Sequence, residues 1–316
     1  MDVRQLRYFV TLAETLHFGR AAQRLGMTQP PLSQAILALE AELGAPLFTR
    51  TKRSVTLTRF GAQWLDHARA GLDAVQALPE IARRLREGEV GRLELSFVST
   101  ADYNILPELV RRYGALYPQV EISLSEATSD LQVAALLEGR GQAGIIIPPV
   151  HDTLPTGLAY RRLLSERLIA AVPQAWLRAG GRLAGAQGAL PAEALADTPL
   201  IVFPRPLAPD FYDKVIAYHR RHGGQARIAQ EAIQMQTIVS LVSAGMGIAL
   251  VPASLRNLAR AGVCYLDLPD DAPVLETGII WRRDDQAPTL TRLLQLAEAI
   301  SAKALPRKRS AKAPGD

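Results

Sequence analysis

The sequence has little of the residue types on which redox, metal and covalent chemistry depend. Its 316 residues include one cysteine, Cys264, so an intramolecular disulfide is excluded, and the apolar run around it predicts packing rather than redox chemistry. The five histidines are scattered without the spacing of metal ligands. Neither a nucleophile elbow nor a phosphate-binding loop is present. We therefore expect no metal, no cofactor and no catalytic residues.

Long apolar runs are absent as well. No stretch near the start has the length of a signal peptide, and none farther along is long enough to span a membrane. We therefore expect a cytoplasmic protein with no membrane partner. With 48% hydrophobic and 21% charged residues, a chain of this length predicts two or three globular domains.

Positive charge is concentrated at the two ends of the chain. Residues 1–60 carry eight Lys or Arg against four Asp or Glu, and residues 303–316 carry five against one. Because the formal net charge of the whole chain is +5, the residues between these ends total −3. This distribution favours contact with nucleic acid at one end. The tail, residues 303–316, has no apolar pattern, and we expect it to be disordered.

The stretch FGRAAQRLGMTQPPLSQAILALEAEL predicts two helices joined by a tight turn. Phe18, Ala21, Ala22 and Leu25 recur at the spacing of one helical face, and Gly26 is the type of residue that ends a helix.

A second, longer helix is expected from about Gln29. Thr28 is positioned to cap it through its hydroxyl, and Pro30 and Pro31 are tolerated in its first turn. Its inward stripe consists of aliphatic residues: Leu32, Ile36, Leu39 and Leu43. Its exposed start carries amides and a hydroxyl, which are groups that read base edges: Gln29, Ser33 and Gln34.

A basic hairpin, PLFTRTKRSVTLT, follows this helix pair. We expect Arg50, Lys52 and Arg53 to crowd one loop tip and to contact phosphates or a minor groove. The alternative is an ordinary helical hairpin, of the kind that any all-α domain contains. The polar start of the second helix and the basic loop together favour binding to double-stranded DNA.

A long helix is predicted from the cap Thr58 to about Glu87. Its apolar seam is spaced by three and four residues: Leu65, Ala68, Leu72, Val75 and Ala82. At ~1.5 Å per residue such a helix is too long to bury its stripe against one compact neighbour, so we expect a partner helix from a second chain. Pro79 should kink or shorten it. The alternative is packing within the same chain.

After Gly88, short apolar runs alternate with helical patterns. The runs LELSFV, VEISLS and AGIII predict parallel strands separated by helices near 105–117 and 129–138, which is a βαβαβ lobe. A second set of runs fills about 161–268: RLIAAVP, LIVFP, RIAQEA, GIALVP and VCYLDL, with helices near 209–222 and 234–244.

The remaining run, ETGIIWR, and a helix at about 288–303 are too short for a third domain. We expect them to return to the first lobe, with crossovers near 148–161 and 269–275 that act as a hinge.

Polar residues follow four of the predicted strands, at the edge where doubly wound sheets bind ligands. The relevant segments are Ser99-Thr100-Ala101-Asp102, Thr128-Ser129, Pro204-Arg205-Pro206 and Gln234-Met235-Gln236-Thr237. Hydroxyls and helix starts suit a carboxylate, Phe203 and Ile146 suit an apolar or aromatic body, and Arg205 suits a counter-charge. Each segment alone is equally well read as a helix cap.

Two other functions fit the sequence less well. Residues 139–144, GRGQAG, match a dinucleotide glycine pattern, but they follow a helix and precede a strand, which is the reverse of the order that an NAD-dependent enzyme needs. A solute-binding protein for transport would need an export signal and would not carry a basic N-terminal module.

The runs LRYFVTLAETLHFGRAAQRLGMTQPPLSQAILALEAELGAPLFTR and LTRFGAQWL resemble the LysR-type transcriptional regulators, and the resemblance extends to about residue 302. It implies groove-facing roles for Gln29, Pro30, Ser33 and Gln34, and a minor-groove role for Arg53. The segments FVSTADYNILPELV, EATSDLQ, IVFPRP and LVSAGMGIALVPAS are similar to the branch that controls degradation of aromatic compounds. They imply effector contacts at Ser99, Thr100, Thr128, Phe203 and Pro204.

The expected architecture is α/β, with a winged helix-turn-helix, a long linker helix and a two-lobed effector domain like periplasmic binding proteins. We expect these parts at 1–58, 59–88 and 89–302, with lobe I at about 89–160 and 269–302 and lobe II at about 161–268. The implied protein is a regulator and not an enzyme, and its effector is an aromatic acid or a muconate-like carboxylate bound between the lobes. Expected partners are an interrupted palindromic operator, a second or further copies in a homodimer or homotetramer, and RNA polymerase if the protein is an activator. Dimerisation is assigned to Leu65, Leu72 and Val75.

Overall fold

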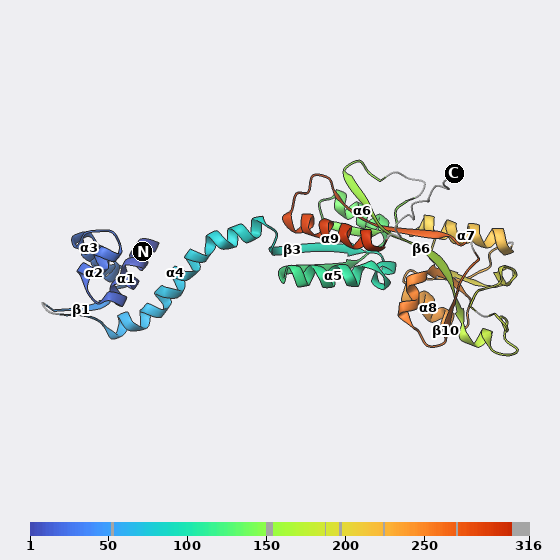
Figure 1. Cartoon of the computed structure of the whole chain (residues 1–316), viewed down its shortest axis with the longest axis horizontal. Helices are drawn as coiled ribbons and strands as arrows, with labels where there is room; N and C mark the ends of the chain where they lie inside the picture. Colours follow the sequence, from blue (N-terminus) through green and yellow to red (C-terminus); the bar gives the residue numbers. More distant parts are fainter. Residues whose placement is uncertain are drawn as a thin grey trace, which may run out of the picture. The chain divides into compact units, whose positions relative to one another are not determined.

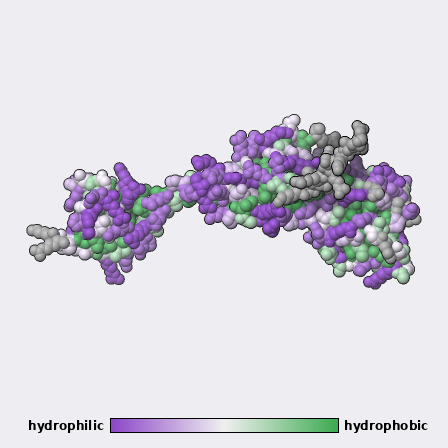
Figure 2. Space-filling view, viewed as in Figure 1, coloured by the Kyte–Doolittle hydropathy of each residue, from purple (hydrophilic) through white to green (hydrophobic). Residues whose placement is uncertain are grey.

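The computed structural model describes residues 1–51, 54–149, 154–186, 188–195, 198–223, 225–269 and 271–304. The chain divides into two compact units, Met1–Arg84 and a second that begins at Leu85 (Figure 1). Polar side chains cover most of the visible face of each unit, with apolar patches between them (Figure 2). Among the described residues, no helix is both long enough and apolar enough to cross a membrane.

The first unit begins with the predicted helix-turn-helix. Helix α1 (Val3–Thr15) is capped by Asp2 in a reciprocal pair with Gln5, and it packs on α2 (Phe18–Arg24) and α3 (Gln29–Leu43). Gly26, with a φ of 64°, provides the left-handed turn between α2 and α3. One detail is wrong: Thr28 precedes α3, but its side chain makes no capping hydrogen bond.

Two short antiparallel strands, β1 (Phe48–Arg50) and β2 (Val55–Leu57), form the wing. The unit's core consists of apolar side chains from these three helices, the wing and the helix that follows the wing, with Phe9 against Phe48 and Trp64 at ring distances of 5.5 and 4.7 Å. The winged helix-turn-helix is therefore present as predicted.

Helix α4 (Arg59–Arg86) starts where the sequence predicts. The Thr58 hydroxyl accepts a hydrogen bond of 2.8 Å from the Gly61 N–H. Gly61 lies against the Leu47 carbonyl, where a Cβ would collide, so glycine lets the helix approach the wing closely. Pro79 lies inside α4 and does not end it, so the predicted shortening does not occur.

Lobe I is a mixed sheet with helices on both faces. Strands β3 (Val90–Phe97), β4 (Gln119–Glu126) and β5 (Ala143–Ile146) are parallel, as predicted, in the order β5-β3-β4. Helices α5 (Ile105–Leu116) and α9 (Pro288–Ala304) pack on one face of this sheet. Helix α6 (Ser129–Leu137) packs on the other face, in a smaller apolar cluster with Leu136 and Ile146.

The return of the C-terminal segment to lobe I is confirmed. Strand β11 (Val274–Arg282) lies between β5 and β6 in the sheet and is antiparallel to both. Helix α9 ends at Ala304, so the first two residues of the predicted tail are helical and residues 305–316 lie outside the described part of the chain.

The first crossover between the lobes differs from the prediction. Strand β6 (Leu158–Pro173) pairs with β11 over residues 158–167 and then with β9 (Ala249–Pro252) and β10 (Val263–Leu266) over 168–173. One continuous strand therefore serves both lobes, and the change of lobe occurs between Arg167 and Leu168 rather than in a connection at 148–161. The residues before this point are mostly polar or half-buried, and those from Leu168 to Pro173 are uniformly apolar and buried, so the composition of the strand changes where its pairing partners change.

Lobe II completes the second unit. A parallel pair, β7 (Leu200–Val202) and β8 (Ile228–Glu231), lies with helices α7 (Pro209–Gly223) and α8 (Met235–Ser243) around a large apolar core. Short 3-10 turns complete the two lobes: η1 (Ser99–Tyr103) in lobe I, and η2 (Gln174–Leu177), η3 (Ala192–Leu195) and η4 (Ala253–Leu258) in lobe II.

Candidate functional site

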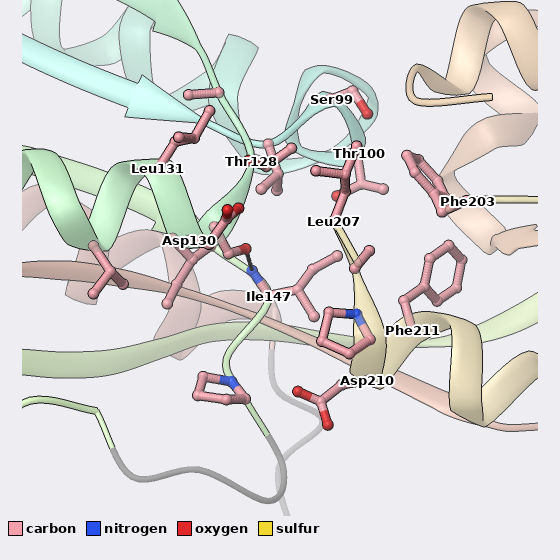
Figure 3. A pocket seen from close by; sticks show the side chains of 18 of the residues that line it. Ser99, Thr100, Thr128, Asp130, Leu131, Ile147, Phe203, Leu207, Asp210 and Phe211 are labelled. Carbon is pink, nitrogen blue, oxygen red and sulfur yellow. Dashed lines mark hydrogen bonds between the residues drawn. The ribbon is translucent and has the colours of Figure 1, made fainter. Parts of the chain in front are cut away.

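A cavity of about 700 Å³ lies between the two lobes. Lobe I contributes the residues after β3, the turn from β4 into α6, and the residues after β5. Lobe II contributes the loop between β7 and α7, and the residues before α8. Figure 3 shows Thr100 and Thr128 on one side of this cavity and Phe203, Leu207 and Phe211 on the other.

The parallel register of lobe I brings these strand ends together. Phe97 is opposite both Glu126 of β4 and Ile145 of β5, and hydrogen bonds of 3.0 Å continue the pairing from Val98 to Ile145 and from Ala127 to Phe97. Residues that directly follow β3 and β4 therefore meet at one edge of the sheet. This is the edge at which the sequence predicts the ligand.

Gln132 holds the strand ends at this edge together. The sequence pattern did not single it out. Its side chain is buried, and its amide N–H groups donate to the carbonyls of Ala127 at 2.8 Å and Ile145 at 3.1 Å. Its carbonyl oxygen accepts from the Ser96 hydroxyl at 3.1 Å. Gly144 is required beside it, because a Cβ there would press on the Gln132 carbonyl oxygen. A glutamine inside an apolar helix face was the available signal.

Two hydroxyls in the cavity wall have no hydrogen-bond partner among the described residues. Thr100 is only 1% exposed, and neither its Oγ1 nor that of Thr128 is paired. Ser129 differs, because its Oγ accepts a hydrogen bond of 3.2 Å from the Ile147 N–H (Figure 3). Buried polar groups are normally satisfied, so two unpartnered hydroxyls on residues that line one cavity are candidate hydrogen-bond donors to a ligand.

Most of the cavity wall is apolar. Phe203 and Phe211 stand with ring centroids 5.5 Å apart at a tilted angle of 57°. The other large apolar residues come from both lobes: Leu131, Ile146, Ile147, Leu154, Leu207 and Ile233. Such walls suit a ligand with an apolar body and few polar groups.

The structure does not place the predicted counter-charge in the cavity. Arg205 is 62% exposed and makes a bidentate ion pair with Asp213 at 2.8 and 2.9 Å, which raises the pKa of its guanidinium. Asp213 lies on α7, the helix that follows the loop carrying Arg205. The ion pair holds the Arg205 side chain away from the cleft. Pro204 does not line the cavity either, whereas Ser99, Thr100, Thr128, Ile146 and Phe203 do.

Three carboxylates that the sequence pattern did not single out also line the cavity: Glu126, Asp130 and Asp210. Asp130 and Asp210 are the second residues of α6 and α7. Acidic residues are common in the first turn of helices, so their position on the sequence did not distinguish them from ordinary helix starts.

The predicted DNA-reading residues lie together at the start of α3. Gln29, Pro30 and Gln34 are exposed and Ser33 is half-buried, while Leu32, Ile36 and Leu39 are fully buried beneath them. The amphipathic helix thus presents its polar end outward, as a recognition helix requires.

The wing residues differ in their surroundings. Arg50 ends β1 instead of standing at the loop tip; its side chain is 27% exposed, pairs with Glu40 at 2.8 Å and lies over the Phe18 ring at 5.0 Å. Glu40 also accepts from the N–H groups of Leu47 and Phe48, so Arg50 completes a network within the domain. Lys52 and Arg53 lie outside the described residues.

The predicted dimerisation seam is partly used within the chain. Leu72 is 7% exposed and belongs to the helix-turn-helix core, and Leu65 packs against the same core. Val75 is exposed, as are the next apolar residues of α4, Leu78 and Ile81. Helical spacing identified an apolar face, but it does not identify which neighbour covers each part of it.

Comparisons with known proteins match almost the whole chain to one family. Residues 3–62 match the family "Bacterial regulatory helix-turn-helix protein, lysR family", and residues 86–300 match "LysR substrate binding domain". The HTH-type transcriptional regulator IlvR of Caulobacter vibrioides is 62% identical over 94% of this chain and 97% of its own length. A probable cat1 operon transcriptional activator of Acinetobacter lwoffii is 33% identical over 96% and 97%.

Solved structures give the same result. Full-length CbnR complexed with its target DNA superposes with a TM-score of 0.77 at 28% identity, covering 95% of this chain and all of that one. The two-lobed effector-binding fold predicted from the sequence is therefore confirmed, and the relatives are regulators rather than enzymes. Both halves of the chain match, so this protein belongs to the LysR family of DNA-binding bacterial transcriptional regulators.

Proposed function

We propose that a small carboxylic acid binds between the two lobes and controls how the protein engages its operator. The observation that carries this proposal is the pair of unpartnered hydroxyls of Thr100 and Thr128 in the wall of an otherwise apolar cavity. A carboxylate accepts hydrogen bonds from both, and Ser99 and the first-turn N–H groups of α6 add further donors.

The apolar wall supports an aromatic or branched body for this acid. The resemblance to regulators of aromatic degradation suggests aromatic acids or muconate-like dicarboxylates. Within these two groups the cavity favours a single carboxylate, because none of its described lining residues carries a positive charge to compensate a second negative one.

On DNA, we propose that Gln29, Pro30, Ser33 and Gln34 face the major groove of an interrupted palindrome, with Lys52 and Arg53 of the wing on the backbone or minor groove. A DNA complex of the similar protein CbnR supports this use of the N-terminal unit. Because Arg50 forms an ion pair with Glu40, we propose that Arg50 positions the wing and does not contact DNA. A regulator of chromosomal genes would act in the cytoplasm.

Two copies are needed to read both half-sites. We propose that they pair through the exposed apolar face of α4 formed by Val75, Leu78 and Ile81, in a homodimer or a homotetramer. If the ligand-bound form activates transcription, RNA polymerase is a further partner; one relative is named as an activator.

The cleft assignment is tested by calorimetric titration of the full chain with benzoate, hydrocinnamate and muconate, in the parent and in Thr100→Val with Thr128→Val. Valine keeps the shape and removes both hydroxyls. Each hydrogen bond to a charged group contributes about 1.5 to 3 kcal/mol, so affinity should fall by about tens-fold or more.

Thr277→Val is the matched control. Thr277 is also fully buried with an unpartnered hydroxyl, but it lies in β11 and does not line the cavity. It should leave the affinity unchanged. If the double variant binds the same acid as tightly as the parent, the hydroxyls do not hold the ligand and the proposed site is wrong.

A further inference from the structure

The cavity has an excess of negative charge. Glu126, Asp130 and Asp210 line it, and among the described residues no lysine, arginine or histidine does. None of the three carboxylates forms an ion pair or hydrogen bond within the described residues. Thr100 lines the same cavity, and its buried hydroxyl has no hydrogen-bond partner among the described residues, so a donor for a ligand lies in the same cavity as the carboxylates.

The surroundings do not neutralise this charge. The helix N-termini of α6 and α7 offset part of the charge of Asp130 and Asp210, since each terminus corresponds to about half a positive charge. Glu126 has no such partner. Asp102, next to this end of the cavity, has its pKa raised first by burial and then by the negative charge of Glu126. Glu126 and Asp130 are exposed and Asp210 is half-buried, so water screens part of this charge. A purely anionic ligand would still meet a net repulsion, and a cationic group would be attracted.

The carboxylates come from both lobes. Asp130 starts α6 in lobe I and Asp210 starts α7 in lobe II, and in Figure 3 they lie on either side of Ile147. A positive group between them would attract both lobes at once. The unpartnered hydroxyls, in contrast, both belong to lobe I and suit a negative group.

Resting on the proposed use of this cleft, we propose that the effector is a zwitterion, an α-amino acid with an apolar side chain. Its carboxylate accepts from Thr100 and Thr128, its ammonium lies between Asp130 and Asp210, and its side chain packs against Phe203, Leu207 and Phe211. The ligand is thereby neutral overall, and each of its charges meets cavity groups that have no side-chain partner in the described part of the chain.

The test compares amino acids with the same molecules lacking the amino group. Full-length protein is titrated with phenylalanine against hydrocinnamate and with leucine against isocaproate, in the parent and in Asp130→Asn with Asp210→Asn. In the parent, at least one amino acid should bind about tenfold tighter than its acid, a difference of about 1.4 kcal/mol. In the double variant this preference should fall to about twofold or less, because the acid binds better and the amino acid worse.

Asp284→Asn is the control, since Asp284 is a lobe I carboxylate that is 85% exposed and lies outside the cavity. It should leave the preference unchanged. If the acids bind the parent as tightly as the amino acids do, or if the preference survives the double variant, the zwitterion assignment is wrong while the cleft remains a carboxylate site. If neither class binds, both the zwitterion and the proposed function of the cleft fail.

Discussion

Asn104 of lobe I donates a hydrogen bond of 2.9 Å to the carboxylate of Glu166, in the strand shared by both lobes. The same carboxylate accepts from the N–H of Ser254 in lobe II at 2.9 Å and from its hydroxyl at 3.1 Å. Asn104 directly follows η1, which carries Ser99 and Thr100 into the cleft. Glu166 therefore connects the ligand-binding turn of one lobe to the other lobe.

Glu166→Gln should weaken this connection, because glutamine has one acceptor oxygen where three donors converge. We expect a loss of about 1 to 3 kcal/mol, and for a unit of this size each kcal/mol lowers the thermal midpoint by about 2 to 4 °C. Glu138→Gln is the control, because Glu138 is 61% exposed and pairs with Arg140 at the surface. Equal midpoints for the two variants would show that the Glu166 contacts add nothing to stability.

Asp102→Asn should stabilise the effector-binding unit at neutral pH. Burial and Glu126 raise the pKa of Asp102, so its charged form is disfavoured in the folded protein. The resulting loss of stability in the parent develops as the pH rises through the raised pKa, and it is absent below the ordinary pKa of an aspartate. The variant should therefore have a higher thermal midpoint than the parent at neutral pH. In acid, below the ordinary pKa of an aspartate, the two midpoints should be equal. Thermal melts across this range decide it, and a gain independent of pH would rule out the titration of Asp102 as the cause.

Gln29→Ala tests base reading by α3. Gln29 is exposed at the start of the helix, and loss of a good side-chain contact to a base edge costs about 1 to 3 kcal/mol on the specific site. Affinity for a random duplex should change little. Gln76→Ala, an exposed glutamine in α4, should leave both affinities unchanged. Anisotropy titrations with both duplexes measure this, and parallel losses on the two would remove Gln29 from sequence reading.

Leu78→Glu combined with Ile81→Glu tests the exposed face of α4. Both side chains project from the helix, with Leu78 57% exposed, so the change should leave the fold intact and place like charges in the proposed helix pair. Dimers should dissociate in sedimentation experiments, and operator affinity should fall with them. Gln76→Glu, on the opposite side of α4, should stay dimeric. A dimer that persists in the double variant would place the interface elsewhere.

Much of the fold follows from local patterns in the sequence. Helical spacing identified α2 and α3, and the glycine turn at Gly26 and the cap at Thr58 are where the sequence predicts them. The polar residues after β3 and β4 identified Thr100 and Thr128 as cavity residues, because parallel strands bring their ends to one edge.

The incorrect predictions share one cause. The spacing of residues in the sequence does not show which other part of the chain a side chain will contact. Leu72 lies on a true apolar face of α4, but its neighbour is the core of its own domain. Arg205 follows a strand end as expected, but Asp213 captures it on the surface. Asp130 and Asp210 resembled ordinary helix starts, and only the folding of two lobes around one cavity brings their charges together.

Control of DNA binding by a ligand between the lobes can be measured by energy transfer across a DNA duplex. This duplex is first selected from a random pool by its binding to the full chain. Labels at the two ends of the duplex report its bend, with and without the acid or amino acid that binds most tightly in the titrations. The account predicts that ligand changes the transfer efficiency with the parent and not with Thr100→Val combined with Thr128→Val at the same ligand concentration. A saturating ligand that changes neither the bend nor the affinity for this duplex would contradict the account.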